Sequence, residues 1–301
     1  MMENAKERLQ IAVQKSGRLT EKTMNILARC GLEIRKSKDQ LFCYGENMPI
    51  DLLLVRDDDI PALVGEDVCD LGIAGLNIIE EKRLNGTFPD NREPYHELRR
   101  MGFGQCRLSL AAAADTPFDG PESLHGKRIA TTYPALTKHY LAEHNIDAEV
   151  VYFSGAVEIA PRLGKAEFIA DLVSTGSTLA ANQLVELQTL LESEVCLIQT
   201  NAPLSEFKQR WINRLLQRIQ GVLQVSESKY IMLHAPRDAL GAIKAILPGS
   251  EAPTILPLEG IEDRVAIHAV CRENVFWETL ESLKEAGASS MLVLPVEKML
   301  A

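Results

Sequence analysis

Short apolar segments alternate with longer amphipathic segments from residue 9 to residue 173. This alternation favours an α/β protein, because apolar runs of strand length separated by helical periodicity are typical of strands connected by helices. The predicted strands are 9–13, 50–55, 71–74, 108–112, 128–131, 150–153 and 168–173. A further helix, predicted over residues 204–223, connects domains and packs on the core through Phe207, Trp211, Leu215, Ile219 and Leu223.

The composition bounds the size and the compartment of the protein. With 301 residues and 46% hydrophobic content, the chain is long enough for two or three domains, each with its own core. No apolar run approaches the ~20 residues that span a bilayer, and the charged start lacks the apolar region of a signal peptide. Six cysteines without a C-x-x-C pair suggest neither a disulfide framework nor a zinc site. We therefore expect a soluble cytoplasmic protein with reduced thiols.

The net charge of −10 argues against nucleic acid or an anionic membrane as a partner, so an anionic substrate needs a local group of cations. Lys15 and Arg18 follow the first predicted strand in a loop of small residues, which resembles a strand-end anion site; a solvated basic turn is the alternative. Arg56 ends another strand. The triple aspartate 57–59 after it suits a helix cap better than a metal site, because three consecutive side chains cannot face one ion.

The segment DLVSTGSTL, residues 171–179, places one carboxylate ahead of a loop of small residues and a predicted helix. Backbone N–H groups at such a turn bind phosphate, and the hydroxyl groups add donors. The loop residues are Ser174, Thr175, Gly176, Ser177 and Thr178. Asp171 can accept hydrogen bonds from ribose hydroxyls beside the phosphate. The segment thus predicts a site for a phosphorylated sugar, and an ordinary Ser or Thr N-cap is the alternative.

Two other strand-to-turn segments contribute candidate residues. Glu158 lies in a turn before a short predicted helix, thirteen residues ahead of Asp171, so the two carboxylates are candidates to flank one ribose. The alternative for Glu158 is an interaction of its charge with the dipole at the helix start. Gly75, in the segment 70–77, lets a ligand approach the backbone closely.

Residues 225–301 form a separate unit by their pattern. The predicted order is βαββαβ, with segments 229–234, 237–247, 254–258, 264–271, 275–288 and 290–296. This order is typical of a ferredoxin-like domain, which often serves as a regulatory module when it follows a catalytic body. A dimerisation or packing domain is the alternative.

Seven motifs occur in order along the chain: QKSGRL, MPIDLLLVRDDDIP, DLGIAGLN, DLVSTGSTL, ESKYIMLHAP, PTILPL and GASSMLVLP. Together they resemble the long form of the ATP phosphoribosyltransferases, which open histidine biosynthesis, and the resemblance covers residues 9–298. Type I phosphoribosyltransferases carry two adjacent acids before a T-G-x-T loop, whereas Ala170 precedes the single Asp171 here. We therefore do not expect the type I fold.

The resemblance implies a catalytic body of two α/β lobes, similar to type II periplasmic binding proteins, with ligands in the cleft between them. A C-terminal ferredoxin-like, ACT-like regulatory domain follows. The chain is expected to cross between the lobes twice. The expected boundaries are 1–104 and 186–224 for the first lobe, 105–185 for the second, and 225–301 for the regulatory domain.

The implied reaction joins the phosphoribosyl group of phosphoribosyl pyrophosphate (PRPP) to the adenine N1 of ATP and releases pyrophosphate. Positive charge develops at the anomeric carbon, so positioning and electrostatics supply most of the catalysis. Mg²⁺ is expected to arrive on the substrate phosphates with few or no protein ligands. Motif position implies that residues 174–178 hold the 5-phosphate. Asp171, Glu158 and Arg18 are expected to bear on catalysis, and Lys15, Arg18, Arg56 and Gly75 to contact ATP or pyrophosphate.

The resemblance also implies feedback inhibition by histidine and a homo-oligomer in which dimers form hexamers. Thr254, Ser289 and Ser290 lie at strand ends in motifs similar to the family's effector region. A solute-binding or effector-sensing module without catalysis is the alternative for the two-lobed body. The lack of a signal peptide and of a basic helix-turn-helix disfavours a transport receptor and a transcriptional regulator respectively.

Overall fold

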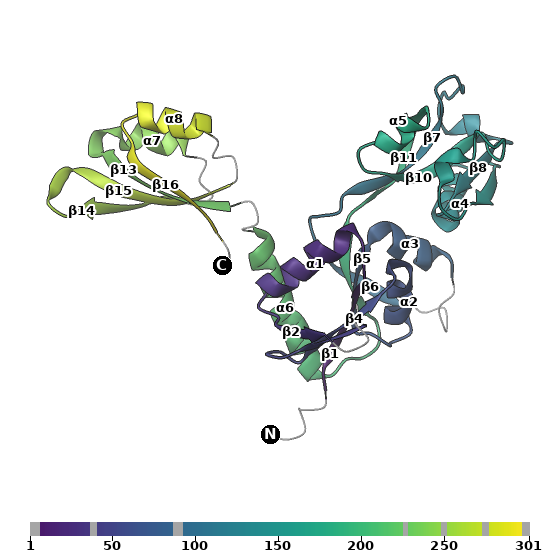
Figure 1. Ribbon diagram of the computed structural model, residues 1–301, viewed down its shortest axis with the longest axis horizontal. Coiled ribbons are helices and arrows are strands. Elements are labelled where there is room, and N and C mark those ends of the chain that lie inside the picture. The colour runs from purple at the N-terminus through teal and green to yellow at the C-terminus, as the bar shows by residue number, and fades with distance from the viewer. Residues whose placement is uncertain are drawn as a thin grey trace. The chain divides into compact units, whose positions relative to one another are not determined.

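The computed structural model describes residues 7–36, 41–86, 93–224, 228–247, 252–272 and 277–296 (Figure 1). The chain divides into two compact units, the first made of Met1–Asn25 and Leu32–Arg210 and the second of Ile26–Gly31 and Trp211–Ala301. The first unit holds a seven-stranded and a five-stranded sheet, which define the first and second lobes, and the second unit holds a four-stranded sheet. Two lobes followed by a βαββαβ domain confirm the predicted fold class.

In the first lobe, β1 (Leu9–Gln14) runs parallel to both neighbours, β4 (Ile50–Val55) and β5 (Leu71–Gly75). β12 (Val195–Thr200) pairs antiparallel with β5 on one side and with β6 (Tyr95–Arg100) on the other. Every residue of β5 and β12 is buried, as expected for apolar strands covered on both faces. The other elements along this part of the chain are α1 (Arg18–Arg29), β2 (Ile34–Lys36), β3 (Phe42–Gly45), α2 (Ile60–Gly65) and α3 (Leu76–Leu84).

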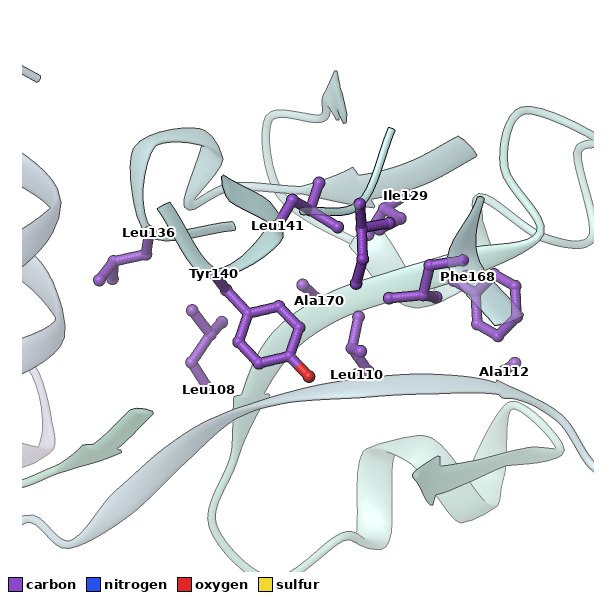
Figure 2. Packing of buried hydrophobic residues seen from close by; sticks show 11 residues of the cluster. Leu108, Leu110, Ala112, Ile129, Leu136, Tyr140, Leu141, Phe168 and Ala170 are labelled. Carbon is purple, nitrogen blue, oxygen red and sulfur yellow. The ribbon is translucent and has the colours of Figure 1, made fainter. Parts of the chain in front are cut away.

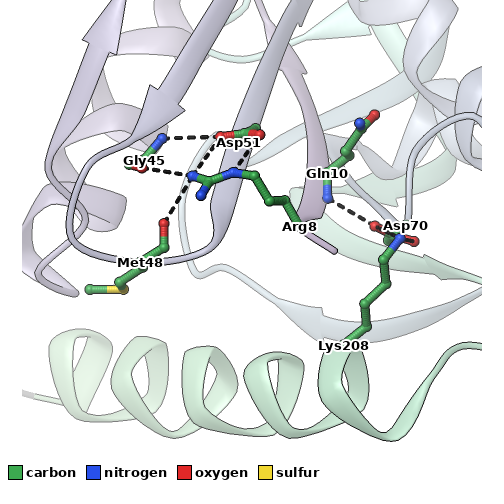
Figure 3. A network of polar contacts seen from close by, with 7 residues as sticks. All are labelled: Arg8, Gln10, Gly45, Met48, Asp51, Asp70 and Lys208. Atoms are coloured by element: carbon green, nitrogen blue, oxygen red, sulfur yellow. Dashed lines mark hydrogen bonds and ion pairs between the residues drawn. The ribbon is translucent and has the colours of Figure 1, made fainter. Parts of the chain in front are cut away.

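An ion pair at the start of β1 ties three strands of the first lobe together (Figure 3). The Arg8 guanidinium donates to both carboxylate oxygens of Asp51, at 2.8 and 2.9 Å. It also donates to the carbonyl oxygens of Gly45 and Met48, at 2.6 and 3.1 Å. A Cβ atom on residue 45 would lie 2.2 Å from the carbonyl oxygen of Ile50, so only glycine fits this turn.

Asp70 makes a second buried contact in the same lobe (Figure 3). Its carboxylate accepts hydrogen bonds from the backbone amide of Gln10 at 2.8 Å and from Lys208 Nζ at 2.8 and 2.9 Å. Lys208 lies in the first turns of α6 (Glu206–Gln224). Asp70 therefore joins the start of β5 to β1 and to the beginning of α6.

In the second lobe, β8 (Arg128–Thr131) lies between β9 (Glu149–Tyr152) and β10 (Phe168–Val173), and the three strands are parallel. β7 (Cys106–Ala113) pairs antiparallel with β10 and with β11 (Leu184–Ser193). Leu108, Leu110 and Phe168 pack with Tyr140 and Leu141 of the covering helix α4 (Pro134–Glu143), as Figure 2 shows. The opposite face packs on α5 (Ser177–Ala181). Alternate residues of each strand thus enter separate cores.

The chain crosses between the lobes twice, between β6 and β7 and again between β11 and β12. The two crossing segments hydrogen-bond to each other. The Met101 amide donates to the Val195 carbonyl at 2.8 Å, the Val195 amide to the Phe103 carbonyl at 3.0 Å, and the Gly102 amide to the Glu194 carboxylate at 2.9 Å. This pairing fixes the two crossings side by side.

The C-terminal sheet has the order β14-β15-β13-β16, and all its neighbouring strands are antiparallel. This is the ferredoxin-like arrangement expected from the βαββαβ order. Both helices cover one face of the sheet (Figure 1), where Ile243 and Leu283 pack on Ile231, Leu233 and Ile267. The elements are β13 (Ser228–Pro236), α7 (Leu240–Ile246), β14 (Thr254–Leu258), β15 (Ile261–Arg272), α8 (Trp277–Glu285) and β16 (Ser289–Pro295).

The predicted strands 50–55, 128–131 and 168–173 coincide with β4, β8 and β10, and the other four are shifted or extended by one or two residues. The sequence did not predict β2, β3, β6, β11 and β12. β6 carries charged residues along its length, and the two bulges of β11 interrupt its side-chain alternation. The start of the predicted helix 275–288 lies outside the described residues, and the predicted domain boundaries remain a prediction. No helix of the described ranges combines the length and apolar character of a membrane span.

The predicted apolar face of α6 is fully buried only in its middle, because Phe207, Trp211 and Leu223 are half-buried. The buried large residues are Ile212, Leu215, Ile219 and Val222, so Leu215 and Ile219 were placed correctly. In a helix of 3.6 residues per turn, four residues rotate by about 400°, which is about 40° more than a full turn. Residues spaced by four throughout therefore drift gradually around the helix. The observed stripe alternates steps of three and four residues and stays on one side.

We predict that replacing Asp51 by alanine lowers the free energy of unfolding of the first lobe by about 2–4 kcal/mol, because a half-buried guanidinium loses its carboxylate. The matched control is Arg35→Ala, which breaks the exposed Arg35–Glu46 pair at 3.8 Å and should cost less than about 1 kcal/mol. Denaturant unfolding followed by circular dichroism measures both. Equal midpoints for the two variants would contradict the role given to Asp51.

Candidate active site

Two adjacent cavities in the first unit share part of their walls. The smaller has a volume of about 520 Å³ and the larger about 740 Å³. Both are in the range of small-molecule sites. The residues that line both cavities are Gln14, Asp57, Ile78 and Tyr133. Since Tyr133 comes from the second lobe and the other three from the first, the cavities lie in the cleft between the lobes.

The cavity walls are built from the carboxyl ends of parallel strands in both lobes. In open α/β sheets this is where ligands bind. Gln14, Gly75 and Tyr152 end β1, β5 and β9. Residues directly after β4, β8 and β10 complete the walls: Arg56 and Asp57, Thr132 and Tyr133, and Ser174.

Four cations line the cavities of this acidic protein. Arg18 and Lys22 belong to the smaller cavity, and Arg56 and Lys82 to the larger. Within the described part of the chain, none of the four forms an ion pair, whereas Arg8, Arg107 and Lys208 are paired elsewhere. Unpaired cations on a concave surface focus positive potential, so the smaller cavity, lined by two cations and one acid, suits an anionic ligand. The larger cavity is also lined by Asp57, Asp58, Asp59 and Glu81, so it suits an anionic ligand that brings a cation with it.

Tyr133 forms a wall common to both cavities. Its hydroxyl accepts a hydrogen bond from Asn77 Nδ2 at 3.0 Å. Burial raises the pKa of the Tyr133 hydroxyl above its usual range, the Asn77 hydrogen bond lowers this pKa, and the charges of Asp171 and Asp57 raise it further. The hydroxyl is therefore protonated at neutral pH and available as a hydrogen-bond donor.

Gln14 and Cys106 are the other polar groups of interest. The Oε1 atom of Gln14 is buried and accepts no hydrogen bond from the described residues. An unsatisfied buried amide oxygen at a cavity wall is suited to accept a bond from a ligand. Burial raises the pKa of the Cys106 thiol, an effect that the nearby Arg18 partly offsets. Cys106 is thus not an activated nucleophile.

The loop 174–178 begins at the smaller cavity, which Ser174 lines. The N-cap of α5 is Gly176, with φ of +79°, so no Ser or Thr stands at the N-cap itself, although Thr175 Oγ1 accepts a hydrogen bond from the Ser177 amide at 3.4 Å. Thr175 Oγ1 and Ser177 Oγ lie 3.0 Å apart. The amide groups of Ser174, Thr175 and Gly176 donate no hydrogen bond to any described residue. The loop therefore offers several free donors at one point.

The two predicted ribose carboxylates lie close enough to interact. Burial raises the pKa of Asp171 above its usual value, the Leu172 amide lowers it, and the charge of Glu158 raises it further. The Leu172 amide donates to Asp171 Oδ1 at 2.8 Å. Asp171 also acts on Tyr133, as described above, so it lies beside the cavities although only its neighbour Leu172 lines them.

The structure brings the predicted residues together only in part. Arg18, Gly75 and Ser174 line the smaller cavity and Arg56 the larger one. Lys15 is exposed, and its amide donates to the Val55 carbonyl at 2.7 Å. The remaining loop residues, Thr175, Gly176, Ser177 and Thr178, line neither cavity.

The three effector candidates lie at opposite edges of the C-terminal sheet. Thr254 is on the edge strand β14, opposite His268 of β15. Ser289 and Ser290 are on the other edge strand, β16, where Arg264 donates to Ser289 Oγ at 2.6 Å. Two central strands, each about 4.8 Å from its neighbour, separate the two sets within one chain.

The aspartates 57–59 form a short 3₁₀ turn ahead of α2. The expectation that they cap this helix was wrong, because Asp59 at the N-cap makes no side-chain capping bond. Asp57 lines both cavities, and Asp58 and Asp59 line the larger one. Among the described residues, no group of three or more His, Cys, Asp or Glu side chains is arranged to hold a metal ion. Carboxylates on a cavity wall do suit a hydrated cation carried by a ligand.

Sequence reasoning missed several residues of the cleft, above all Gln14, Lys22, Asn77, Glu81 and Tyr133. Gln14 and Tyr133 each end or directly follow a predicted strand. Their place at strand carboxyl ends was a usable signal, since ligand sites gather there in α/β proteins. Lys22 and Glu81 lie within helices and carry no such signal.

The sequence model of the family described as "ATP phosphoribosyltransferase" matches residues 56–221, and that of "HisG, C-terminal domain" matches residues 226–298. Among solved structures, the chain is similar to the "ATP phosphoribosyl transferase (HisG:HisZ) complex" from Thermotoga maritima. The identity is 24% over 70% of this chain and 98% of that chain, with a TM-score of 0.57.

Two matches to binding domains are weaker. A histidine kinase sensor domain with similarity to periplasmic binding proteins is 12% identical over 71% of this chain and 89% of its own, with a TM-score of 0.45. A probable amino-acid ABC transporter extracellular-binding protein from Bacillus subtilis is 12% identical over 71% and 91%, with a TM-score of 0.44. Since the family match spans more than half of the chain, the protein belongs to the ATP phosphoribosyltransferases, pentosyltransferases that use ATP, PRPP and a divalent metal ion in the first step of histidine biosynthesis.

Proposed function

We propose that the two adjacent cavities hold the two substrates of the reaction, with PRPP in the smaller cavity and ATP in the larger. The observation that carries this assignment is the convergence of strand ends from both lobes on two cavities that share one wall. These cavities carry four cations that form no ion pair with any described residue. Two anionic substrates that react with each other need such a pair of connected sites. The shared wall at Tyr133 is where the adenine N1 and the anomeric carbon meet.

The loop 174–178 binds the 5-phosphate of PRPP. The free amide groups described above and the exposed hydroxyls of Ser174, Ser177 and Thr178 supply the donors. The pyrophosphate group then extends toward Arg18 and Lys22 in the smaller cavity. The ATP phosphates take Arg56 and Lys82 of the larger cavity. Gly75 of the smaller cavity and the exposed Lys15, which lines neither cavity, are further contacts.

Asp171 and Glu158 hold the ribose hydroxyls. When the pyrophosphate leaves, positive charge develops at the anomeric carbon, and these carboxylates lie on the side of the cleft where they stabilise it. Arg18 stabilises the negative charge of the departing pyrophosphate. The adenine N1 of ATP is the nucleophile, so the protein needs no nucleophilic side chain. Catalysis comes from orientation and from charges set in advance.

We infer Mg²⁺ as the divalent ion, carried on the substrate phosphates. Asp57 is the carboxylate best suited to hold it, because Asp57 lines both cavities. Mg²⁺ retains several waters and needs one or two carboxylates besides phosphate oxygens. When bound, it neutralises charge on the pyrophosphate leaving group.

We also infer that the C-terminal domain binds histidine as an inhibitor and joins copies of the chain into dimers and hexamers. The three effector candidates occupy opposite edges of the sheet, so a pocket that uses all of them takes residues from two copies. The helix-free face of this sheet exposes Leu256, Leu292 and Leu294 at 46–52%, which supports a contact surface. Six free cysteines are consistent with a cytoplasmic enzyme.

We predict that Thr178→Ala raises the KM for PRPP by roughly tenfold to a hundredfold, because a hydrogen bond to a charged group contributes about 1.5–3 kcal/mol. The KM for ATP should stay within about twofold. Steady-state kinetics with each substrate varied in turn measures both constants. Thr116→Ala is the control, since Thr116 lies outside both cavities in the same lobe. Unchanged constants in Thr178→Ala would remove the phosphate role of this residue.

The pH dependence should report Asp171. Its pKa is raised, so kcat/KM for PRPP should fall on acidification at a higher pH than an ordinary aspartate would cause. Glu158→Gln removes one charge that raises this pKa, and the acidic limb should move to lower pH. Glu149→Gln, at an exposed position of the same lobe, should leave the limb in place. If the acidic limb does not move in Glu158→Gln, protonation of Asp171 is not the cause of the limb.

Regulation is tested by following the absorbance of the phosphoribosylated adenine product with ATP, PRPP, Mg²⁺ and pyrophosphatase, with and without histidine. Suppression by histidine is expected. Suppression should weaken in Ser290→Ala while turnover without histidine stays unchanged, because Ser290 lines neither cavity. Turnover that histidine leaves unaffected in the parent protein would refute the regulatory role and leave the catalytic assignment standing.

A further inference from the structure

The carboxylate of Glu81 binds the N-terminus of a helix in the opposite lobe. Glu81 lies on α3 of the first lobe, and its two oxygens accept hydrogen bonds from the amides of Ala135 and Leu136, each at 2.8 Å. Both amides belong to the first turn of α4 in the second lobe. The negative charge also matches the positive end of the helix dipole.

The hydrogen-bond accounting of α4 shows that this contact replaces a local cap. Tyr133 at the N-cap makes no side-chain capping bond, and Pro134 has no amide hydrogen to satisfy. The Thr137 amide already donates to the Tyr133 carbonyl at 3.0 Å. The amides of Ala135 and Leu136 are therefore the two unsatisfied donors of the first turn, and Glu81 takes both.

Asn77 extends the contact one turn earlier on the same face of α3. It is 4% exposed and makes the hydrogen bond to Tyr133. The Asn77 Oδ1 atom accepts a hydrogen bond from Ser193 Oγ at 2.9 Å, and the backbone amide of Asn77 donates to Ser193 Oγ at 3.1 Å. Ser193 ends β11, where the chain crosses back to the first lobe. A continuous set of bonds thus links the crossing to the start of α4.

We propose that Glu81 and Asn77 form an interlobe latch that fixes the N-terminus of α4, and with it the Tyr133 wall, in the geometry of the reactive cleft. Glu81 is then a positioning residue for both substrates, since Tyr133 lines both cavities. The kinetic part of this proposal rests on the substrate assignment above; the latch itself does not.

The latch has a clear chemical logic. Backbone amides at a helix start need an acceptor wherever they lie, so a carboxylate that serves them from another lobe is exchanged for water when the lobes separate. The two hydrogen bonds to Glu81 fix the orientation of the helix start, yet breaking them costs little free energy because water replaces the carboxylate. It suits a cleft that must admit two substrates and release two products.

The test uses three variants of the full chain. Glu81→Ala removes both acceptor oxygens, and Glu81→Gln keeps one of them. Glu80→Ala is the matched control on the same helix, because Glu80 pairs with Arg83 of its own lobe at 3.6 Å. Hydrogen–deuterium exchange measures protection of the Ala135 and Leu136 amides. Steady-state kinetics measures KM for each substrate and kcat.

We expect Glu81→Ala to lower the protection of these two amides by roughly twofold to thirtyfold, the range that corresponds to losing a helix cap. It should lower kcat/KM for ATP and for PRPP by a similar factor, with Glu81→Gln intermediate and Glu80→Ala unchanged. Equal amide protection in Glu81→Ala and Glu80→Ala would refute the latch. If the two amides lose protection but kcat/KM is normal, Glu81 is only a structural cap. If kcat/KM falls for one substrate alone, Glu81 contacts that substrate directly instead.

Discussion

The double crossing of the chain between the two lobes is the constraint on which the catalytic body depends. Antiparallel pairing places the start of one strand beside the end of its neighbour. β12 begins at Val195, which pairs with Gly75 at the carboxyl end of β5. β7 begins next to Arg107, which pairs with Val173 at the carboxyl end of β10. The crossing therefore lies at the carboxyl ends of the parallel strands in both sheets, and these ends meet in one cleft.

The same crossing explains how an acidic protein gathers cations at its cleft, beside the aspartates 57–59 and Glu81. The net charge of −10 belongs to the whole chain, whereas the cleft gathers Arg18, Lys22, Arg56 and Lys82 from segments that follow different strands. Elsewhere some acids and bases are paired within a lobe. Arg107 and Glu186 join β7 to β11, and the Arg107 hydrogen bond holds the pKa of Glu186 below its usual value. The four cleft cations form no such pair with a described residue, so they are available to bind the substrates.

The candidate site was predictable where chemistry and sequence order coincide. Residues 171–178 carry a carboxylate, hydroxyls and a glycine within one turn, so local sequence was enough to select them. Tyr133 and Asn77 could not be selected in this way, because their hydrogen bond joins residues 56 positions apart in different lobes. Gln14 carries no charge, and it became notable only because its buried Oε1 has no hydrogen-bond partner among the described residues.

The sequence alone determined the α/β class, the βαββαβ order of the C-terminal unit, most strand positions in the first 173 residues and, through its motifs, the family. These follow from local periodicity and short motifs, which depend on neighbours along the chain. Tertiary structure decided the rest: which strands pair, that Glu81 caps a helix of the other lobe, and that the effector candidates lie at opposite sheet edges. Such contacts depend on packing between distant segments, and the free energy that selects them appears only when the whole unit folds.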